Sequence, residues 1–166
     1  MQKTLAILHE LEAAGLVERY ALGGAMAGFF YAEAVITEDL DAFVLFKTND
    51  SLITLTPIYD FLKQRGATEE REHLWLAGTL VQLIPAYDAI TEEAVREAVE
   101  KTVGQTKTRV MRVEHLIAIA LKTGRAKDSA RVALLLEEAE VDEPRLRDIL
   151  LRHRLQERWE KHKLNP

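Results

Sequence analysis

Residues 20–46 read YALGGAMAGFFYAEAVITEDLDAFVLF, and this stretch is the most specific feature of the chain. Its first three residues, Tyr20-Ala21-Leu22, form a short apolar run that predicts a strand ending in a glycine turn. The small apolar residues of 25–31 favour a buried helix. The continuous apolar run of 42–46 predicts a strand that is buried on both faces. A strand, a glycine turn, a helix and a second strand in this order indicate an α/β core.

The same stretch carries the residues that point to chemistry. Gly23 and Gly24 let the backbone turn sharply and approach a ligand closely, and a helix that begins after them presents free N–H groups to a phosphate. Asp39 and Asp41 stand two residues apart at the entry to a strand, so both side chains point to one face. Two adjacent carboxylates repel each other, and a hard divalent cation such as Mg²⁺ relieves that repulsion. The combination predicts a site for a nucleotide and Mg²⁺.

Outward from this stretch, hydrophobic periodicity and turn residues predict the remaining elements. Helices are expected at 3–14, at 57–66, from 91 onward, and then at about 113–123, 127–140 and 144–162. Hairpins are expected at 72–84 and 102–111, around Ala77-Gly78 and Gly104-Gln105. Strands that give way to helices indicate a small mixed sheet followed by a helical part. We therefore expect an α/β core in residues 1–112 and a C-terminal helical part, residues 113–166, packed on it.

Composition narrows the class of protein. The chain has 166 residues, of which 48% are hydrophobic, enough for one core with or without a helical annex. It has no cysteine, which excludes disulfides and thiolate catalysis. No apolar run is long enough to cross a bilayer and the N-terminus does not resemble a signal peptide, so a cytoplasmic protein is expected. The net charge of −5 argues against broad, non-specific nucleic-acid binding, although basic residues gather in 107–131 and 145–166.

Residues 20–46 resemble the opening motif of the nucleotidyltransferase superfamily, the fold shared with DNA polymerase β. They are most similar to the bacterial branch that includes the AbiEii-type toxins. In that branch a strand leads to Gly-Gly, an alanine-rich helix follows, and an Asp-x-Asp pair comes roughly a dozen residues later. The segments 81–85 and 114–128 extend the likeness to roughly residues 18–130.

The resemblance implies transfer of a nucleotidyl group from a nucleoside triphosphate to a hydroxyl of a protein, an RNA end or a small molecule. Asp39 and Asp41 would be the catalytic pair and hold Mg²⁺. The nucleotide-binding residues would include Gly23, Gly24, Thr37 and Gln82. In the basic strip 107–131, Lys122, Arg125 and Lys127 follow one another around a junction between two helices and either contact phosphates or are exposed helix ends. The family usually has a third carboxylate on a later strand, and the best matching position here is the neutral Gln82.

Three hypotheses for the function stay open at this point. The retained Asp39-x-Asp41 pair favours an enzyme. Gln82 favours a binding module that keeps the pocket without turnover and acts as an oligomer or as a partner of another protein. A purely structural domain is the third. Among the other residues, His115 is either a proton carrier or a structural histidine. His73 shows no metal-ligand spacing, and Trp75 is expected in the core.

Overall fold

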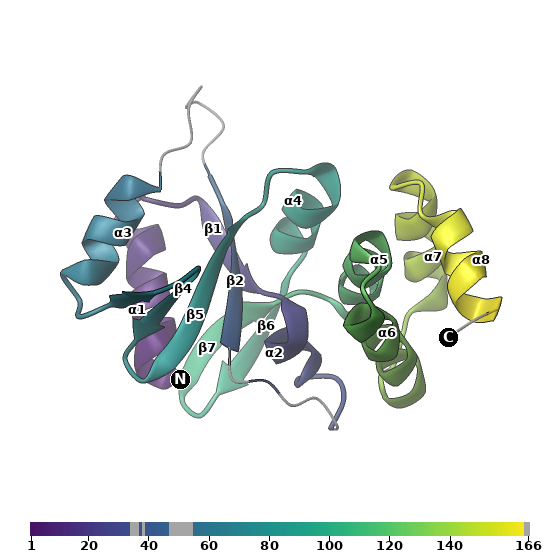
Figure 1. The fold of residues 1–166 in the computed structure, drawn as a ribbon, viewed down its shortest axis with the longest axis horizontal. Coiled ribbons are helices and arrows are strands. Elements are labelled where there is room, and N and C mark those ends of the chain that lie inside the picture. The colour runs from purple at the N-terminus through teal and green to yellow at the C-terminus, as the bar shows by residue number, and fades with distance from the viewer. Residues whose placement is uncertain (34–36, 38, 47–54, 165–166) are drawn as a thin grey trace.

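The computed structural model describes residues 1–33, 37, 39–46 and 55–164. Within these ranges the chain forms a seven-stranded sheet and eight helices (Figure 1). The strands are β1 (Arg19–Leu22), β2 (Asp39–Leu45), β3 (Thr68–Glu70), β4 (His73–Leu76), β5 (Thr79–Pro85), β6 (Val99–Val103) and β7 (Thr106–Val110). The helices are α1 (Gln2–Ala13), α2 (Gly24–Gly28), α3 (Thr56–Lys63), α4 (Ala89–Arg96), α5 (Val113–Thr123), α6 (Ala126–Glu138), α7 (Glu143–Arg152) and α8 (Gln156–Leu164). The expected α/β class is confirmed.

The strand order β3-β4-β5-β2-β1-β7-β6 puts β2 in the centre of the sheet. β2 runs parallel to β5, β1 runs parallel to β7, and the remaining neighbours are antiparallel. Residues 42–45 of β2 are buried, as the continuous apolar run predicts. The two expected hairpins are β4–β5 and β6–β7, and both join at the predicted turns. Because β5 is the parallel neighbour of β2, the polar residues at the start of β2, Asp39 and Asp41, lie beside β5.

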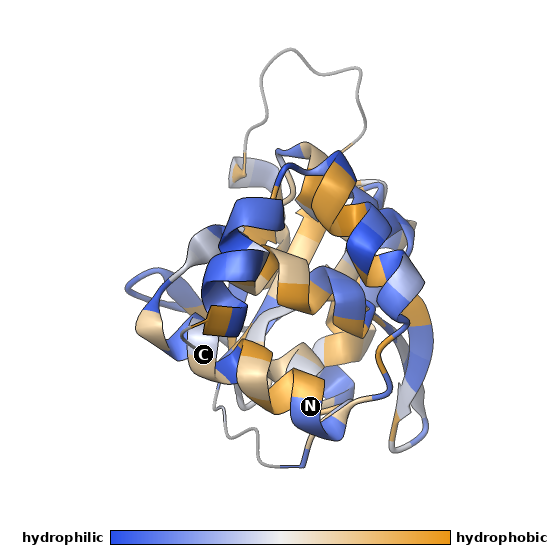
Figure 2. Cartoon of the chain, turned by 90° about the vertical axis from the view of Figure 1, so that its right-hand side faces the viewer, coloured by the Kyte–Doolittle hydropathy of each residue, from blue (hydrophilic) through white to orange (hydrophobic). Residues whose placement is uncertain are grey.

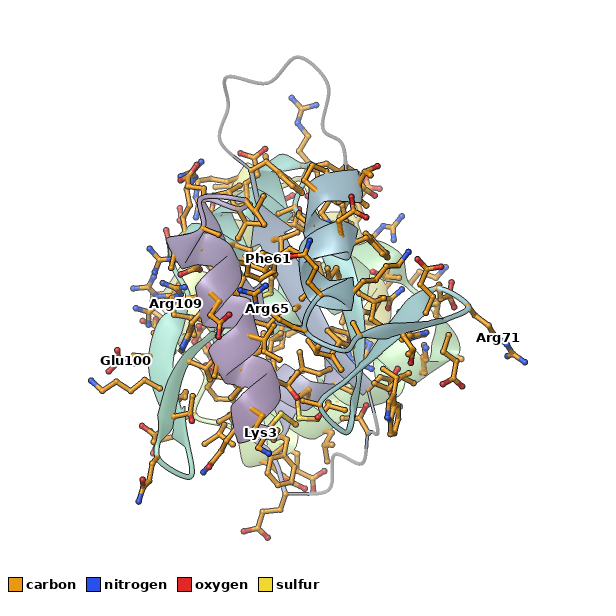
Figure 3. All side chains as sticks on the ribbon, turned by 90° about the vertical axis from the view of Figure 1, so that its left-hand side faces the viewer. Lys3, Phe61, Arg65, Arg71, Glu100 and Arg109 are labelled. Atoms are coloured by element: carbon orange, nitrogen blue, oxygen red, sulfur yellow. The ribbon has the colours of Figure 1, made fainter. Side chains whose placement is uncertain are left out.

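Helices α1 and α3 lie together against one face of the sheet, while α2 and α4 lie on the other side (Figure 1). Leu5, Leu8 and Leu11 form the apolar stripe of α1 and are fully buried. Figure 3 shows Phe61 of α3, and Arg65 just after the end of α3, next to α1. The Arg65 guanidinium lies 3.3 Å from the centroid of the Phe61 ring and its Nε donates a hydrogen bond to α1. These contacts fix α3 on α1, away from the face that carries Asp39 and Asp41.

The C-terminal helices assemble around α5, in which eight of eleven residues are buried. α5 contacts α2 and α4 on the side of the sheet, and α6, α7 and α8 on its other sides. Figure 2 shows hydrophilic and hydrophobic residues mixed along these helices. Helices α6 and α7 each bury one side, whereas His162 is the only buried residue of α8 as described. The predicted boundary after residue 112 coincides with the start of α5 at Val113. That residues 1–112 and 113–166 form two units stays a prediction. None of the helices in the described ranges is long and apolar enough to cross a membrane.

The single helix expected at 144–162 is wrong, because the structure has two helices there. α7 ends at Arg152, and Arg154 adopts a left-handed backbone with φ of 56°. The Leu155 N–H then donates to the Leu150 carbonyl at 2.8 Å, which closes the helix end. The turn carries the Leu155 side chain into the core. No glycine or proline marks this break in the sequence.

Three further expectations differ from the structure. The helix expected at 25–31 is a five-residue helix, Gly24–Gly28, followed by turns. The short strand Thr68–Glu70 was not anticipated, because an edge strand of exposed polar residues has no apolar alternation. Trp75 is not in the core: 48% of it is exposed, because it points away from the face that α1 and α3 cover.

Candidate nucleotide and metal site

The parallel pairing of β2 with β5 builds one wall of a cleft. In this register Asp41 lies beside Gln82, and Phe43 lies beside Ile84. Because side chains alternate along a strand, Asp39 shares the face of these four residues. The structure thus brings the two aspartates and Gln82 together on one face, as strand alternation and the family alignment predicted.

Helices α5 and α6 form the opposite wall of this cleft, which has a volume of about 740 Å³. Its lining residues are Gly24, Ala25, Thr37, Asp39, Asp41, Phe43, Gln82, Ile84, Met111, Leu116, Ile119, Ala120, Thr123, Arg125, Lys127, Asp128 and Arg131. The floor is apolar and the rim carries charges of both signs. The cleft therefore combines a surface that can pack against a flat apolar group with groups that bind phosphate and metal.

The two glycines are required by residues of β2 that pack against them. Gly24 has a φ of +57°, and a Cβ there would lie 1.6 Å from Asp41 Oδ2. A Cβ on Gly23 would lie 2.4 Å from the Phe43 ring. Gly23 also donates its N–H to the Asp41 carbonyl oxygen at 2.9 Å. The close approach expected at Gly24 is thus made by the Asp41 carboxylate, and the short α2 adds little helix dipole for a phosphate.

Asp39 is held by Thr37 and has a histidine nearby. Thr37 Oγ1 donates to Asp39 Oδ1 at 3.0 Å, which orients the carboxylate. His73 Nε2 lies 3.8 Å from Asp39 Oδ2 and comes from β4, two strands away in the sheet. Nearly half of the Asp39 side chain, 47%, is exposed, so this carboxylate is accessible to a ligand. His73 cannot be placed here from local sequence, because the pairing of β4 with β5 and of β5 with β2 brings it beside Asp39.

Asp41 is the more deeply placed carboxylate. Burial and then the charge of Asp39 raise the pKa of Asp41, while Arg131, His73 and Lys127 counteract part of this shift. A raised pKa means that the ionised carboxylate is not fully compensated by its surroundings. A divalent cation would provide the missing compensation, and oxygen atoms of two adjacent carboxylates are the donors that Mg²⁺ prefers. The residues present therefore fit a magnesium ion.

The first turns of α6 carry three basic residues into the cleft: Arg125, Lys127 and Arg131. Asp128 is buried and holds two of them, accepting from Arg125 Nε at 2.7 Å and from Arg131 Nη1 at 3.4 Å. Their guanidinium groups are therefore held in place, which reduces the entropy lost on binding a phosphate. Arg125 and Lys127 were predicted from the sequence. Arg131 and Asp128 were missed, although their spacing on one helix was the available signal.

Lys122 lies outside this cleft. It is on the face of α5 that meets α4, and its Nζ pairs with Asp88 Oδ2 at 2.5 Å. Asp88 is the N-cap of α4, where its Oδ1 accepts from the Thr91 N–H. Contact between Lys122 and a nucleotide in the cleft would require breaking this ion pair.

A second cluster joins α4 to α5 and to the end of α7. Glu93 accepts hydrogen bonds from His115 Nε2 at 2.9 Å, from His153 Nε2 at 3.0 Å and from Arg152. Burial alone would raise the pKa of Glu93, but these hydrogen bonds lower it to about 2. Glu93, Glu97 and His115 are close enough to share an ion. Arg152 already compensates Glu93, so the contacts support the structural interpretation of His115.

Comparison with known proteins shows where this fold occurs. No protein-family model and no curated protein sequence matches the chain. The solution structure of the antibiotic-resistance factor ANT(2'')-Ia has a TM-score of 0.52 and 14% identity, with 98% of each chain covered. The crystal structure of ANT(2")-Ia in complex with adenylyl-2"-tobramycin has a TM-score of 0.53 and 16% identity, with 95% of each chain covered.

A third solved structure is an antigenic nucleotidyltransferase-like protein from Paracoccidioides brasiliensis. It has a TM-score of 0.53 and 12% identity, covering 81% of this chain and 73% of that one. The chain therefore has the fold of nucleotidyltransferases. At these identities the likeness concerns the fold alone. The closer similarity to the AbiEii-type toxins stays a prediction.

Proposed function

We propose that the chain binds a nucleoside triphosphate together with Mg²⁺ and transfers its nucleotidyl group to a hydroxyl. The observation that carries this proposal is the cleft in which Asp39 and Asp41 face a wall of fixed basic residues. Carboxylates on one side and guanidinium groups on the other suit a metal-bound polyphosphate. One structural neighbour, solved with adenylyl-2"-tobramycin, holds an adenylyl group joined to an acceptor.

Each residue has a defined part in this proposal. Asp39 and Asp41 hold the cation, and Thr37 keeps Asp39 in its orientation. Arg125 and Arg131 bind phosphate oxygens on the opposite side. When bound, Mg²⁺ neutralises charge on the phosphates. In the transfer, the acceptor oxygen forms a bond to the α-phosphorus, the bond to the leaving pyrophosphate breaks, and the hydroxyl proton passes to solvent.

The acceptor hydroxyl belongs to a protein, an RNA end or a small molecule. Three basic residues line the cleft, Arg125, Lys127 and Arg131, and so do three acidic ones, Asp39, Asp41 and Asp128. These charges balance, so the lining repels neither a cationic nor an anionic acceptor. The proposed location is the cytoplasm.

A second candidate function is a binding module of the same fold without turnover. The observation that favours it is the position of Gln82, directly beside Asp41 in the β2–β5 register. A glutamine can offer a carbonyl oxygen to a cation, but it carries no charge and accepts no proton at neutral pH. Such a module would retain nucleotide and metal binding and act through a protein partner or as an oligomer.

Titration of Mg²⁺ in the presence of a non-hydrolysable nucleoside triphosphate tests both candidates. Asp41→Asn should weaken binding of the cation, and Gln82→Asp should tighten it, because each changes the negative charge at the site by one. Asp60→Asn is a matched control, since Asp60 is an exposed aspartate on α3. Equal affinities in the wild type and in all three variants would overturn the proposal.

Turnover is measured separately, with nucleotides labelled at the α-phosphate and with RNA, protein and small-molecule fractions as acceptors. Label transferred by the wild type and not by Asp41→Asn establishes the enzyme. Metal-dependent nucleotide binding without transfer of label to any fraction favours the binding module.

A further inference from the structure

We propose that His73, which lies beside the cleft at Asp39 and not in its lining, is a nitrogen ligand of the cation held by Asp39 and Asp41 and gives the site a preference for transition-metal ions over Mg²⁺. This inference rests on the proposed function, because it concerns the same cation. It adds a ligand type, and a metal selectivity, that two aspartates and a glutamine do not provide.

The sheet places His73 at the end of a row of polar side chains. Leu74 pairs with Val81 in the antiparallel β4–β5 ladder, so His73 is the neighbour of Gln82. Gln82 in turn pairs with Asp41. His73, Gln82 and Asp41 therefore follow one another across three strands and share a face. This face also carries Asp39, and α1 and α3 lie on the opposite one.

The distance between His73 and Asp39 leaves room for an ion. His73 Nε2 and Asp39 Oδ2 are 3.8 Å apart, which is too long for a hydrogen bond. Adjacent ligands of one octahedral ion, each about 2.1 Å from the metal, lie about 3 Å apart. The two atoms would therefore move toward each other by under about 1 Å when an ion binds. The three ligand atoms of His73, Asp39 and Asp41 are not preassembled, so Asp41 must move toward the ion.

His73 is also available for this role. Its side chain is 18% exposed, and within the described residues it makes no hydrogen bond to another group. His115 and His153, by contrast, are both bonded to Glu93. An imidazole at the edge of a carboxylate pair, with an unbonded Nε2 facing it, is placed to bind a metal.

The charge balance of the site explains what such a ligand would do. With Gln82 in place of a third carboxylate, the site holds two negative charges, and a histidine adds a donor without adding charge. Imidazole nitrogen binds Co²⁺ and other later transition metals more strongly than it binds Mg²⁺, which prefers oxygen. The chain should therefore bind Co²⁺ and Mn²⁺ more tightly than Mg²⁺, and His73 should account for the larger part of the difference for Co²⁺.

The experiment uses the full chain at mildly alkaline pH with Mg²⁺, Mn²⁺ and Co²⁺ as probes. Affinities are measured by calorimetry for the wild type, His73→Asn, Asp41→Asn and the control His9→Asn. His9 lies on α1, with its ring 5.5 Å from that of Tyr20. Pulsed electron paramagnetic resonance on bound Mn²⁺ then tests for coupling to a ¹⁴N nucleus, which a merely structural histidine would not produce.

We expect His73→Asn to lose at least about tenfold in Co²⁺ affinity, with a smaller loss for Mg²⁺ and no remaining ¹⁴N coupling. His9→Asn should behave as the wild type. If Asp41→Asn abolishes binding while His73→Asn keeps both its affinity for Co²⁺ and the nitrogen signal, this inference is wrong and the proposed function stands. Absence of binding for all three ions, with and without nucleotide, would overturn both. Nitrogen coupling that survives in Asp41→Asn would place the ion elsewhere and overturn the inference.

Discussion

Replacement of Gly24 by alanine tests the packing at the centre of the candidate site. Gly24 has a φ of +57°, and an added Cβ would lie 1.6 Å from Asp41 Oδ2. No side chain can share that space, so the Asp41 carboxylate must rotate away. We expect Gly24→Ala to lower both the free energy of unfolding and the affinity for a metal-bound nucleotide.

The magnitude follows from two contributions. An alanine with left-handed backbone costs about 1–2 kcal/mol relative to glycine. Forcing the Asp41 side chain off its rotamer costs about 1 kcal/mol more. The total of about 2–3 kcal/mol corresponds to a fall in melting temperature of about 5–10 °C for a chain of this size.

Gly78→Ala is the matched control for the backbone contribution. Gly78 has a φ of +83° in the turn between β4 and β5, and a Cβ there would meet no heavy atom within 4 Å. Gly78→Ala should therefore lose only the backbone contribution of about 1–2 kcal/mol, and its metal affinity should be unchanged. In a background of Asp41→Ala, the cost of Gly24→Ala should fall toward that of Gly78→Ala, since the carboxylate is gone.

Thermal melting and Mg²⁺–nucleotide titration of these four variants check the reasoning. Equal losses of stability in Gly24→Ala and Gly78→Ala would show that the Asp41 carboxylate does not pack on Gly24. A stable Gly24→Ala protein with wild-type metal affinity would refute the role given to this glycine altogether.

Two predictions concern stability and pH. Asp41 has a raised pKa in the folded protein, so its contribution to stability is present at low pH and is lost as the pH rises from 3.8 through that raised pKa. Metal-free Asp41→Asn should therefore become more stable than the wild type across this window in melts at several pH values. A wild type that gains stability over the variant there would contradict the assignment. Glu93 has a pKa lowered to about 2, so its contribution is present above 4.5 and is lost as the pH falls toward 2. Glu93→Gln should lose about 2 kcal/mol at neutral pH and much less in acid, measured by urea unfolding. A loss of stability that does not depend on pH would mean that the stabilisation does not come from the charge of Glu93.

The two hairpin turns and the central strand can be predicted from the sequence, because they depend on residues that are neighbours in the chain. The turns at Ala77-Gly78 and Gly104-Gln105 join antiparallel hairpins in the structure, since left-handed glycines favour tight reversals. The apolar run at 42–46 gives the central strand. The break between α7 and α8 was missed because Arg154 takes a left-handed backbone that arginine rarely adopts alone, and the burial of Leu155 stabilises it.

In the candidate site, the shared face of Asp39 and Asp41 can be predicted from local sequence, because alternation along a strand is a local property. The sequence also predicts Arg125 and Lys127 as nucleotide-binding residues, and the family resemblance predicts Gln82 as another. The folded structure is needed to see that Lys122 pairs with Asp88, that Arg131 faces the cleft, and that His73 lies beside Asp39. The physical reason is that strand register and helix packing depend on contacts between residues distant in the chain. No local pattern around His73 contains the β4–β5–β2 pairing that places it.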